Sequence, residues 1–194
     1  MSVLPYLETE RLVIWMPDSM SASVVADYYR RNADFLSRWD PPRPPGFTTE
    51  AYWRDRLRRN AADFLEGRSA RMMIREKQDL VTVYGSINLT NIIRGAMFAG
   101  NLGYGLDESR EGRGYMTEAL AEFLRFSFHS LGLRRLMAGF QPENTKSARV
   151  LEKLGFVREG YAKEYLFIDG AWRDHVLCSM TNPDFRFPTG VGSK

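Results

Sequence analysis

The chain has 194 residues, of which 44% are hydrophobic, 13% aromatic and 26% charged, close to the average for globular proteins. This composition excludes disordered, collagen-like and coiled-coil proteins. The net charge of +3, from 27 Lys and Arg against 24 Asp and Glu, is too small to indicate a nucleic-acid partner by itself. We expect one compact domain over residues 1–183 and a loosely held tail over residues 184–194.

Two absences in the sequence narrow the class of protein further. No apolar run approaches the roughly 18 residues that cross a bilayer, and the first residues lack the pattern of a signal peptide. We therefore expect a cytoplasmic protein without a membrane partner. One cysteine, Cys178, and two histidines supply neither a disulfide nor a zinc-ligand pattern, so no metal is expected and Cys178 is predicted to lie in the core.

The first half of the chain predicts helices on either side of a proline-rich loop. Residues 10–16 predict a strand, and a helix follows that begins at Asp18 or Ser19 and continues to about Leu36. Four of the five residues 41–45 are proline, which predicts a stiff loop along a cleft, with Trp39 as a candidate substrate-binding residue. Residues 49–66 predict an amphipathic helix with a solvated, arginine-rich face.

The second half of the chain alternates between strand and helix patterns. A period of two residues predicts strands, and a period of 3.6 residues predicts helices. The predicted segments are strands at 70–76, 80–91 and 95–106, a helix at about 116–127, a strand at 135–140, a helix at 143–154, and a hairpin at 156–167 and 172–180. This order predicts an α/β (α+β) domain with a mixed, mostly antiparallel sheet of about seven strands and helices on both faces.

A glycine-rich segment lies where a predicted strand passes into a helix. Gly112 and Gly114 stand at the expected start of that helix, where unpaired backbone N–H groups and the positive end of the helix dipole meet. Arg113 and Thr117 add a charge and a hydroxyl. This pattern indicates an anion site, although a G-x-G at a helix start is weak evidence alone.

A second helix start follows the next predicted strand. Asn144 is placed as an ordinary N-cap three residues before Ser147, and Gly155 as an ordinary C-cap. Alone, this segment indicates only a helix. Together with the glycine-rich segment it places two helix N-termini beside the same end of the sheet, which suits a long phosphorylated cofactor.

The combination resembles a known family. The segment Glu111–Ala119, followed by Asn144-x-x-Ser147 and Glu152–Phe156, resembles the GNAT acyl-CoA N-acetyltransferases. Four further segments resemble the RimJ-type ribosomal-protein alanine N-acetyltransferases: Thr9–Leu12, Phe35–Pro41, Asn91–Gly95 and Glu159–His175. The resemblance covers nearly the whole chain, and its C-terminal block is the most specific part.

The resemblance implies acetyl-CoA as co-substrate and assigns residues to it. Backbone groups of Tyr104, Gly105 and Leu106 would pair with the pantetheine arm, and Asn144 would hydrogen-bond that arm. The pyrophosphate would be wrapped by Glu111, Gly112, Arg113, Gly114, Tyr115, Met116 and Thr117. In two places the chain departs from the family pattern: Glu111 replaces the usual Gln or Arg, and Leu151 replaces the tyrosine that acts as general acid in many relatives, so we take Ser147 as the replacement.

The chemistry implied is direct acetyl transfer to an amine. An α-amino group with a pKa near 8 is mostly protonated at neutral pH, so a base is required. Glu164 is the candidate for that base and Glu159 its competitor. The neutral amine would attack the thioester while backbone N–H groups stabilise the oxyanion and Ser147 assists the leaving thiolate.

Three functions remain open at this point. The acceptor is either the N-terminal α-amine of a protein, such as a ribosomal-protein alanine, or a small amine such as an antibiotic, a peptide toxin or an amino acid. The third possibility is a non-catalytic assembly factor that associates with the ribosome through the arginine-rich helix. The sequence is compatible with a monomer or a homodimer.

Overall fold

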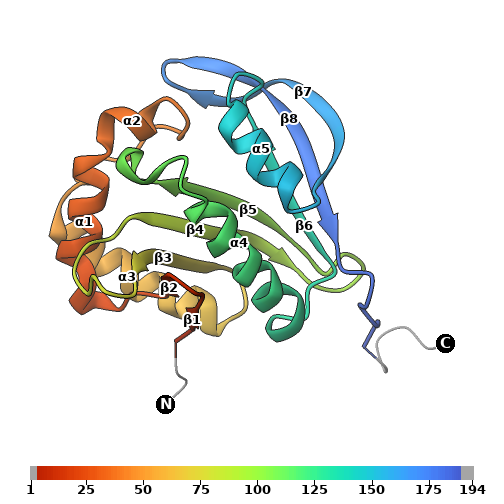
Figure 1. Ribbon diagram of the computed structural model, residues 1–194, viewed down its shortest axis with the longest axis horizontal. Helices are drawn as coiled ribbons and strands as arrows, with labels where there is room; N and C mark the ends of the chain where they lie inside the picture. Colours follow the sequence, from red (N-terminus) through yellow and green to blue (C-terminus); the bar gives the residue numbers. More distant parts are fainter. Residues whose placement is uncertain (1–3, 189–194) are drawn as a thin grey trace.

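The computed structural model describes residues 4–188, which build one eight-stranded sheet in the order β1-β2-β3-β4-β5-β6-β8-β7 (Figure 1). The strands are β1 (Tyr6–Glu8), β2 (Leu12–Trp15), β3 (Ala70–Glu76), β4 (Gly85–Ile93), β5 (Ala99–Leu106), β6 (Arg135–Phe140), β7 (Val157–Ile168) and β8 (Ala171–Thr181). All neighbouring strands are antiparallel except β5 and β6. The predicted fold class is confirmed, with one strand more than expected.

Helices cover both faces of the sheet, as predicted. They are α1 (Ala22–Arg31), α2 (Ala33–Ser37), α3 (Glu50–Leu65), α4 (Tyr115–Arg125) and α5 (Thr145–Lys153). Successive side chains of a strand point to opposite faces, so Met72 and Ile74 of β3 pack with α4 while Met73 packs with α1 and α3. Within residues 4–188, no helix has the length and apolar character that crossing a bilayer requires.

The core contains the residues that the helical pattern predicted. Phe123 and Leu120 of α4 are fully buried against the sheet, and Cys178 is buried with them. On the other face Trp53 and Leu57 of α3 are buried, while the arginines of that helix lie outward, which confirms the predicted amphipathic helix. Thr49 caps α3 through a hydrogen bond from the N–H of Tyr52.

Strand boundaries differ from the predictions where side chains or glycine form turns. β4 begins at Gly85 and not at residue 80, because the Asp79 carboxylate accepts hydrogen bonds from the N–H groups of Val81 and Thr82 at 3.0 and 2.9 Å and holds a turn there. β5 begins at Ala99 because Gly95 and Phe98 have φ of +70° and +45°, outside the extended conformation of a regular strand, and form a turn there. The additional strand, β1, has only three residues, too few to show a period of two.

The first residues of the predicted C-terminal tail pack against the domain. Over residues 184–188, which were predicted to begin a loose tail, the rings of Phe185 and Phe187 lie 5.2 and 5.4 Å from the ring of Phe98. The rest of that predicted tail, residues 189–194, falls outside the described residues.

The single parallel strand pair parts half-way along its length. β5 and β6 pair from Ala99 with Arg135 to Leu102 with Ala138. Beyond this point β5 remains paired with β4 as far as Leu106, and β6 remains paired with β8 as far as Phe140. Figure 1 shows the two strands side by side at one end and diverging towards the other. Residues 103–106 therefore carry backbone groups on their β6 side that pair with no strand in the described part of the chain.

Candidate acetyl-CoA site and its acceptor end

A cleft of about 640 Å³ opens where β5 and β6 part. Its walls are the end of β5, the loop and first turn of α4, the first turns of α5, and the segment from α2 to Asp40. The cleft is lined by these predicted site residues: Trp39, Tyr104, Gly105, Leu106, Glu111, Gly112, Gly114, Tyr115, Met116, Thr117, Asn144 and Ser147. Segments more than one hundred residues apart in sequence thus meet in one cavity.

The loop before α4 presents its backbone N–H groups to this cleft. Gly112 and Gly114 have φ of +72° and +77°, a conformation that glycine adopts without strain. Within the described residues, no protein acceptor binds the N–H groups of residues 112–117, and Gly114 caps the helix without any side-chain hydrogen bond. Unpaired donors at the positive end of a helix dipole are suited to binding a phosphate.

Arg11 holds this loop from outside the cleft. Its Nη1 donates to the carbonyl oxygen of Arg113 at 3.1 Å, and its Nε donates to Glu118 Oε2 at 2.6 Å. The guanidinium also lies 4.5 Å from the ring centre of Tyr115. Arg113 was predicted to bind the cofactor. Its carbonyl oxygen accepts the hydrogen bond from Arg11, and Arg113 is not among the residues that line the cleft.

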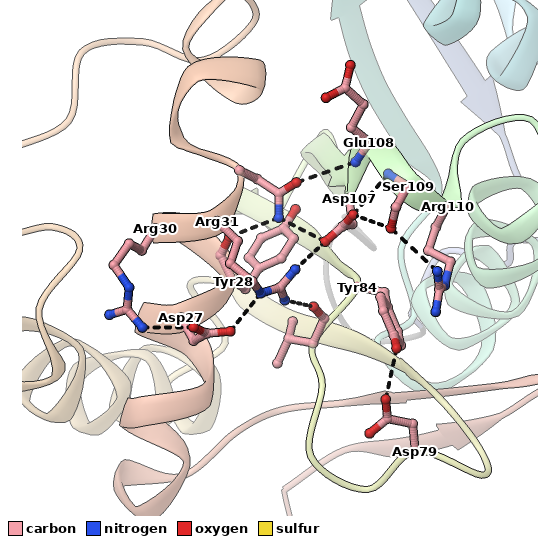
Figure 2. Close-up of polar contacts among 12 residues, drawn as sticks. Asp27, Tyr28, Arg30, Arg31, Asp79, Tyr84, Asp107, Glu108, Ser109 and Arg110 are labelled. Atoms are coloured by element: carbon pink, nitrogen blue, oxygen red, sulfur yellow. Dashed lines mark hydrogen bonds and ion pairs between the residues drawn. The ribbon is translucent and has the colours of Figure 1, made fainter.

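A buried carboxylate fixes the chain between β5 and the loop. Asp107 accepts hydrogen bonds from Arg31 Nη1 at 2.5 Å, from Asn32 Nδ2 at 3.1 Å and from the Ser109 hydroxyl at 2.6 Å (Figure 2). Burial by itself raises the pKa of the Asp107 carboxyl, but the hydrogen bonds from Ser109, Asn32 and Arg31 outweigh it and keep the pKa below its usual value. The C-terminal end of α1 is thereby tied to the start of the loop.

Glu111 faces a lysine across the cleft. Its carboxylate forms an ion pair with Lys146 Nζ of α5. A carboxylate beside a diphosphate is unfavourable by itself, and this ion pair neutralises the charge of Glu111. Arg149 and Lys153 of the same helix also line the cleft, so α5 contributes three cationic side chains to this wall.

Two hydroxyl groups meet at the parting of the strands. The Tyr104 hydroxyl lies 2.8 Å from Ser147 Oγ and 3.3 Å from the Ser147 carbonyl oxygen. Burial raises the pKa of Tyr104 to about 12, although the hydrogen bond with Ser147 acts in the opposite direction. Tyr104 therefore stays protonated at neutral pH, and when it donates to Ser147 Oγ, the serine proton is free to point into the cleft.

Asn144 caps α5 as predicted, because its Oδ1 accepts a hydrogen bond from the N–H of Ser147 at 3.0 Å. Its amide nitrogen has no hydrogen-bond partner among the residues that the structure describes, so it can bind a ligand. Nearby, the buried side chain of Gln141 donates from Nε2 to the carbonyl oxygen of Arg38 at 3.0 Å. This contact ties the end of β6 to the segment that carries Trp39.

Comparison with known proteins identifies the family. The model of the acetyltransferase (GNAT) domain matches residues 12–157, well over half of the chain. The chain belongs to the GNAT acetyltransferase family. It is therefore an N-acetyltransferase that uses acetyl-CoA, and the predicted co-substrate is confirmed at this level.

Several GNAT relatives resemble the chain over nearly all of its length. The [ribosomal protein uS5]-alanine N-acetyltransferase of Escherichia coli is 38% identical over 179 residues, covering 92% of each chain. The crystal structure of the ribosomal-protein-S5-alanine acetyltransferase of Vibrio fischeri superposes with a TM-score of 0.90 at 35% identity, covering 94% of this chain and 99% of that one. RimJ of Mycobacterium smegmatis, solved in complex with CoA-disulfide, has a TM-score of 0.83 at 28% identity and covers 92% and 86%.

The predicted base of this GNAT enzyme lies away from the cleft. Glu164 is an exposed residue of β7 at a register shift, with φ of +49°, and its N–H donates to Asp174 Oδ1 at 2.8 Å. Its competitor Glu159 forms an ion pair with Arg135 on the edge of the sheet. Neither side chain lines the cleft. Glu164 lies where the pairing of β7 with β8 shifts register, between Ala162 and Leu166.

Several residues of the GNAT cleft carried no local sequence signal. The carboxylates lining it are Asp40, Glu108, Glu111 and Glu143, and its apolar wall includes Phe35 and Leu36. Among residues 4–188, no three His, Cys, Asp or Glu side chains gather as metal ligands would. Asp40 and Phe35 lie within the quoted RimJ-like segment, which was the one hint that they belong to the site.

Proposed function

We propose that this enzyme acetylates the N-terminal α-amine of a protein, and specifically the N-terminal alanine of a ribosomal protein. The proposal is supported by the 38% identity with the uS5-alanine acetyltransferase of Escherichia coli over 92% of both chains. Structural similarity to the S5-alanine enzyme of Vibrio fischeri supports the same acceptor.

The observation that carries the acetyl-CoA part of the proposal is the set of free backbone N–H groups at residues 112–117 beside the unpaired edge of β5. The diphosphate of CoA would accept hydrogen bonds from this loop. The pantetheine amides would pair with Tyr104, Gly105 and Leu106 as an additional strand pairs with a sheet edge. Asn144 would hydrogen-bond the same arm through its free amide group.

The chemistry that follows is direct transfer without a covalent enzyme intermediate. The neutral amine attacks the thioester carbonyl carbon, and N–H groups at the open edge of β5 stabilise the oxyanion. As the C–S bond breaks, the Ser147 hydroxyl donates a proton to the thiolate while Tyr104 supports Ser147 by a hydrogen bond. An acid on this helix is thereby supplied although Leu151 replaces the usual tyrosine.

The proposal is tested with a peptide of the alanine-terminated N-terminus of uS5. The enzyme and acetyl-CoA are incubated with this peptide, with the same peptide blocked at its α-amine, and with small amines such as an aminoglycoside and free alanine. Mass spectrometry should find one acetyl group on the open peptide only. Turnover restricted to the small amines would refute the protein acceptor while leaving the GNAT chemistry intact.

The ribosome-binding alternative is separated by a second arm of this test. Two of the four arginines of α3 are paired within the helix, Arg54 with Glu50 and Arg58 with Asp55. We therefore expect little salt-dependent affinity for ribosomes. A steep loss of ribosome binding with rising salt would instead favour the arginine face as an RNA contact.

A further inference from the structure

A second cavity of about 440 Å³ adjoins the acetyl-CoA cleft at one side chain. Its walls are the proline-rich loop, with Pro41, Pro42 and Phe47, and the turn Asp169-Gly170 of the β7–β8 hairpin. Asp40 lines both this cavity and the cleft, and among residues 4–188 it is the only one that does so. A carboxylate therefore stands at the junction of the two cavities.

Asp40 is held with one oxygen bound and the other available. Its Oδ2 accepts a hydrogen bond from Arg43 Nη2 at 2.8 Å, and the side chain is 38% exposed. Arg43 is itself fixed, since its guanidinium lies 5.0 Å from the ring centre of Tyr29 and 4.9 Å from that of Phe47. Within residues 4–188, no donor is bound to Asp40 Oδ1.

The backbone around Asp40 is also fixed on two sides. The Asp40 N–H donates to the Leu36 carbonyl oxygen at 2.9 Å, and the preceding Arg38 carbonyl accepts the hydrogen bond from Gln141 at the end of β6. Asp40 thus has a defined place relative to the parting of β5 and β6. Its carboxylate belongs to a rigid wall, as a group that must orient a reactant should.

The other carboxylates along the two cavities are less suited to an acceptor amine. Glu111 is already paired with Lys146. Glu108 and Glu143 line the cleft and not the second cavity, whereas Asp169 lines the second cavity and not the cleft. A primary amine approaching the acetyl group from the second cavity would meet Asp40 first.

We propose that Asp40 binds the acceptor's ammonium group through Oδ1 and accepts a proton from it before acetyl transfer. This inference rests on the proposed function, in that it needs an amine acceptor, and it deepens that function by naming the residue that receives the amine. The ligand is a primary amine, and the group that carries the amine occupies the second cavity.

The proton and electron balance is simple. The ammonium loses one proton to Asp40 Oδ1, and the nitrogen lone pair then forms the C–N bond as the C–S bond breaks. The thiolate takes the Ser147 proton, and Ser147 recovers one from the nitrogen. Asp40 releases its proton to solvent. Burial raises the pKa of Asp40, with Arg43 opposing the shift, so its carboxylate accepts a proton more readily than an exposed aspartate does.

The test compares Asp40→Asn and Asp40→Glu with Asp34→Asn as a matched control. Asp34 is an exposed aspartate of α2 that lines neither cavity. Each variant is melted to confirm folding and assayed with the N-terminal peptide and with a small primary amine. We expect Asp40→Asn to lose about 100-fold in kcat/KM for the amine, with KM for acetyl-CoA changed less than twofold. Asp40→Glu should retain more activity than Asp40→Asn, and Asp34→Asn should stay near wild type.

Two results would overturn the inference. One is wild-type kcat/KM for the amine in Asp40→Asn, and the other is an equal loss in Asp40→Asn and Asp34→Asn. If Asp40→Asn does not fold, the activity of Asp40→Glu decides, because an inactive but folded charge-retaining variant would contradict a role in receiving the amine. Should the wild type modify only the small amine, the protein acceptor is lost, and the same variants assayed on that amine still decide the role of Asp40.

Discussion

At the scale of single residues, the hydroxyl groups of Tyr104 and Ser147 replace the tyrosine hydroxyl that the family pattern predicts on α5. Leu151 is buried in the core and does not line the cleft. Tyr104 approaches instead from β5 and lies 2.8 Å from Ser147 Oγ. A strand residue and a helix residue that lie 43 positions apart in the sequence can thus together supply the general acid.

Removal of either hydroxyl should slow the proton transfer to sulfur. We expect Ser147→Ala to lower kcat about 10- to 100-fold, and Tyr104→Phe to lower it by less, because general acid help is worth about 100-fold or more. The double variant should be no slower than Ser147→Ala, since the two groups act as a unit. Steady-state kinetics measure this, with Ser127→Ala as control: Ser127 is buried remote from the cleft and donates to the Phe123 carbonyl oxygen at 2.8 Å. A full additive loss would contradict a shared role.

Residue-scale prediction from sequence succeeded where a motif is local. Gly112, Gly114, Asn144 and Ser147 lie next to helix starts, and their conformations follow from the chain nearby. The contacts of Ser147 with Tyr104 and of Glu111 with Lys146 join different elements, and nothing in the adjacent sequence predicts them. The role of Asp40 could not be predicted from the adjacent sequence either, because the two cavities that it lines form only when the whole chain folds.

At the scale of elements, the turn into α4 depends on left-handed glycines. A Cβ at Gly112 would meet no atom within 4 Å, so Gly112→Ala strains only the backbone, by about 1–2 kcal/mol. Relief of that strain would turn the N–H groups away from the diphosphate. We expect KM for acetyl-CoA to rise about tenfold. Gly67→Ala is the matched control, because Gly67 has φ of +71°, equal free space and no place in the cleft. An equal KM change in both variants would contradict the assignment of the loop.

The hydrogen bonds of Asp107, which tie the end of α1 to the loop before α4, stabilise the fold by an amount that depends on pH. Because the pKa of Asp107 in the folded protein lies below 3.8, its contribution is complete above that value and is lost as pH falls through the folded pKa. We expect Asp107→Asn to reduce the free energy of unfolding by about 2 kcal/mol at pH 6. The difference from wild type should shrink towards pH 2. Urea unfolding at several pH values measures this, and a difference that grew at low pH would contradict it.

Element boundaries show why some predictions from sequence failed. The strands and helices themselves followed from periodicity, and β3 and β6 have the predicted limits. β4 starts late because Asp79 forms a turn in a stretch that is otherwise apolar, with Leu80 and Val81 exposed. The register shift in β7 likewise has no pattern in the sequence, and it determines where Glu164 lies.

At the scale of the whole molecule, the sheet consists of two parts that share only the short β5–β6 pairing. A ligand lying between β5, α4 and α5 would touch both parts, and it would therefore stabilise the fold as a unit. At a CoA concentration 100 times Kd we expect about 2.7 kcal/mol of stabilisation. For a domain of this size, that corresponds to a rise in Tm of about 5 to 10 °C.

Thermal melting with and without CoA measures this effect. Gly112→Ala should need a higher CoA concentration for the same rise, whereas Gly67→Ala should start from a lower Tm and then show the wild-type shift. No rise at saturating CoA in the wild type would contradict a cofactor site between the two parts.

The burial of Cys178 has a practical consequence for kinetic work. It is the only sulfhydryl of the chain, and burial in the sheet raises the pKa of its thiol. An Ellman-type thiol reagent added during turnover should therefore react almost only with the thiol of the released CoA. The native enzyme contributes little background, and one equivalent per chain appears only after denaturation, which gives each assay an internal standard for protein concentration.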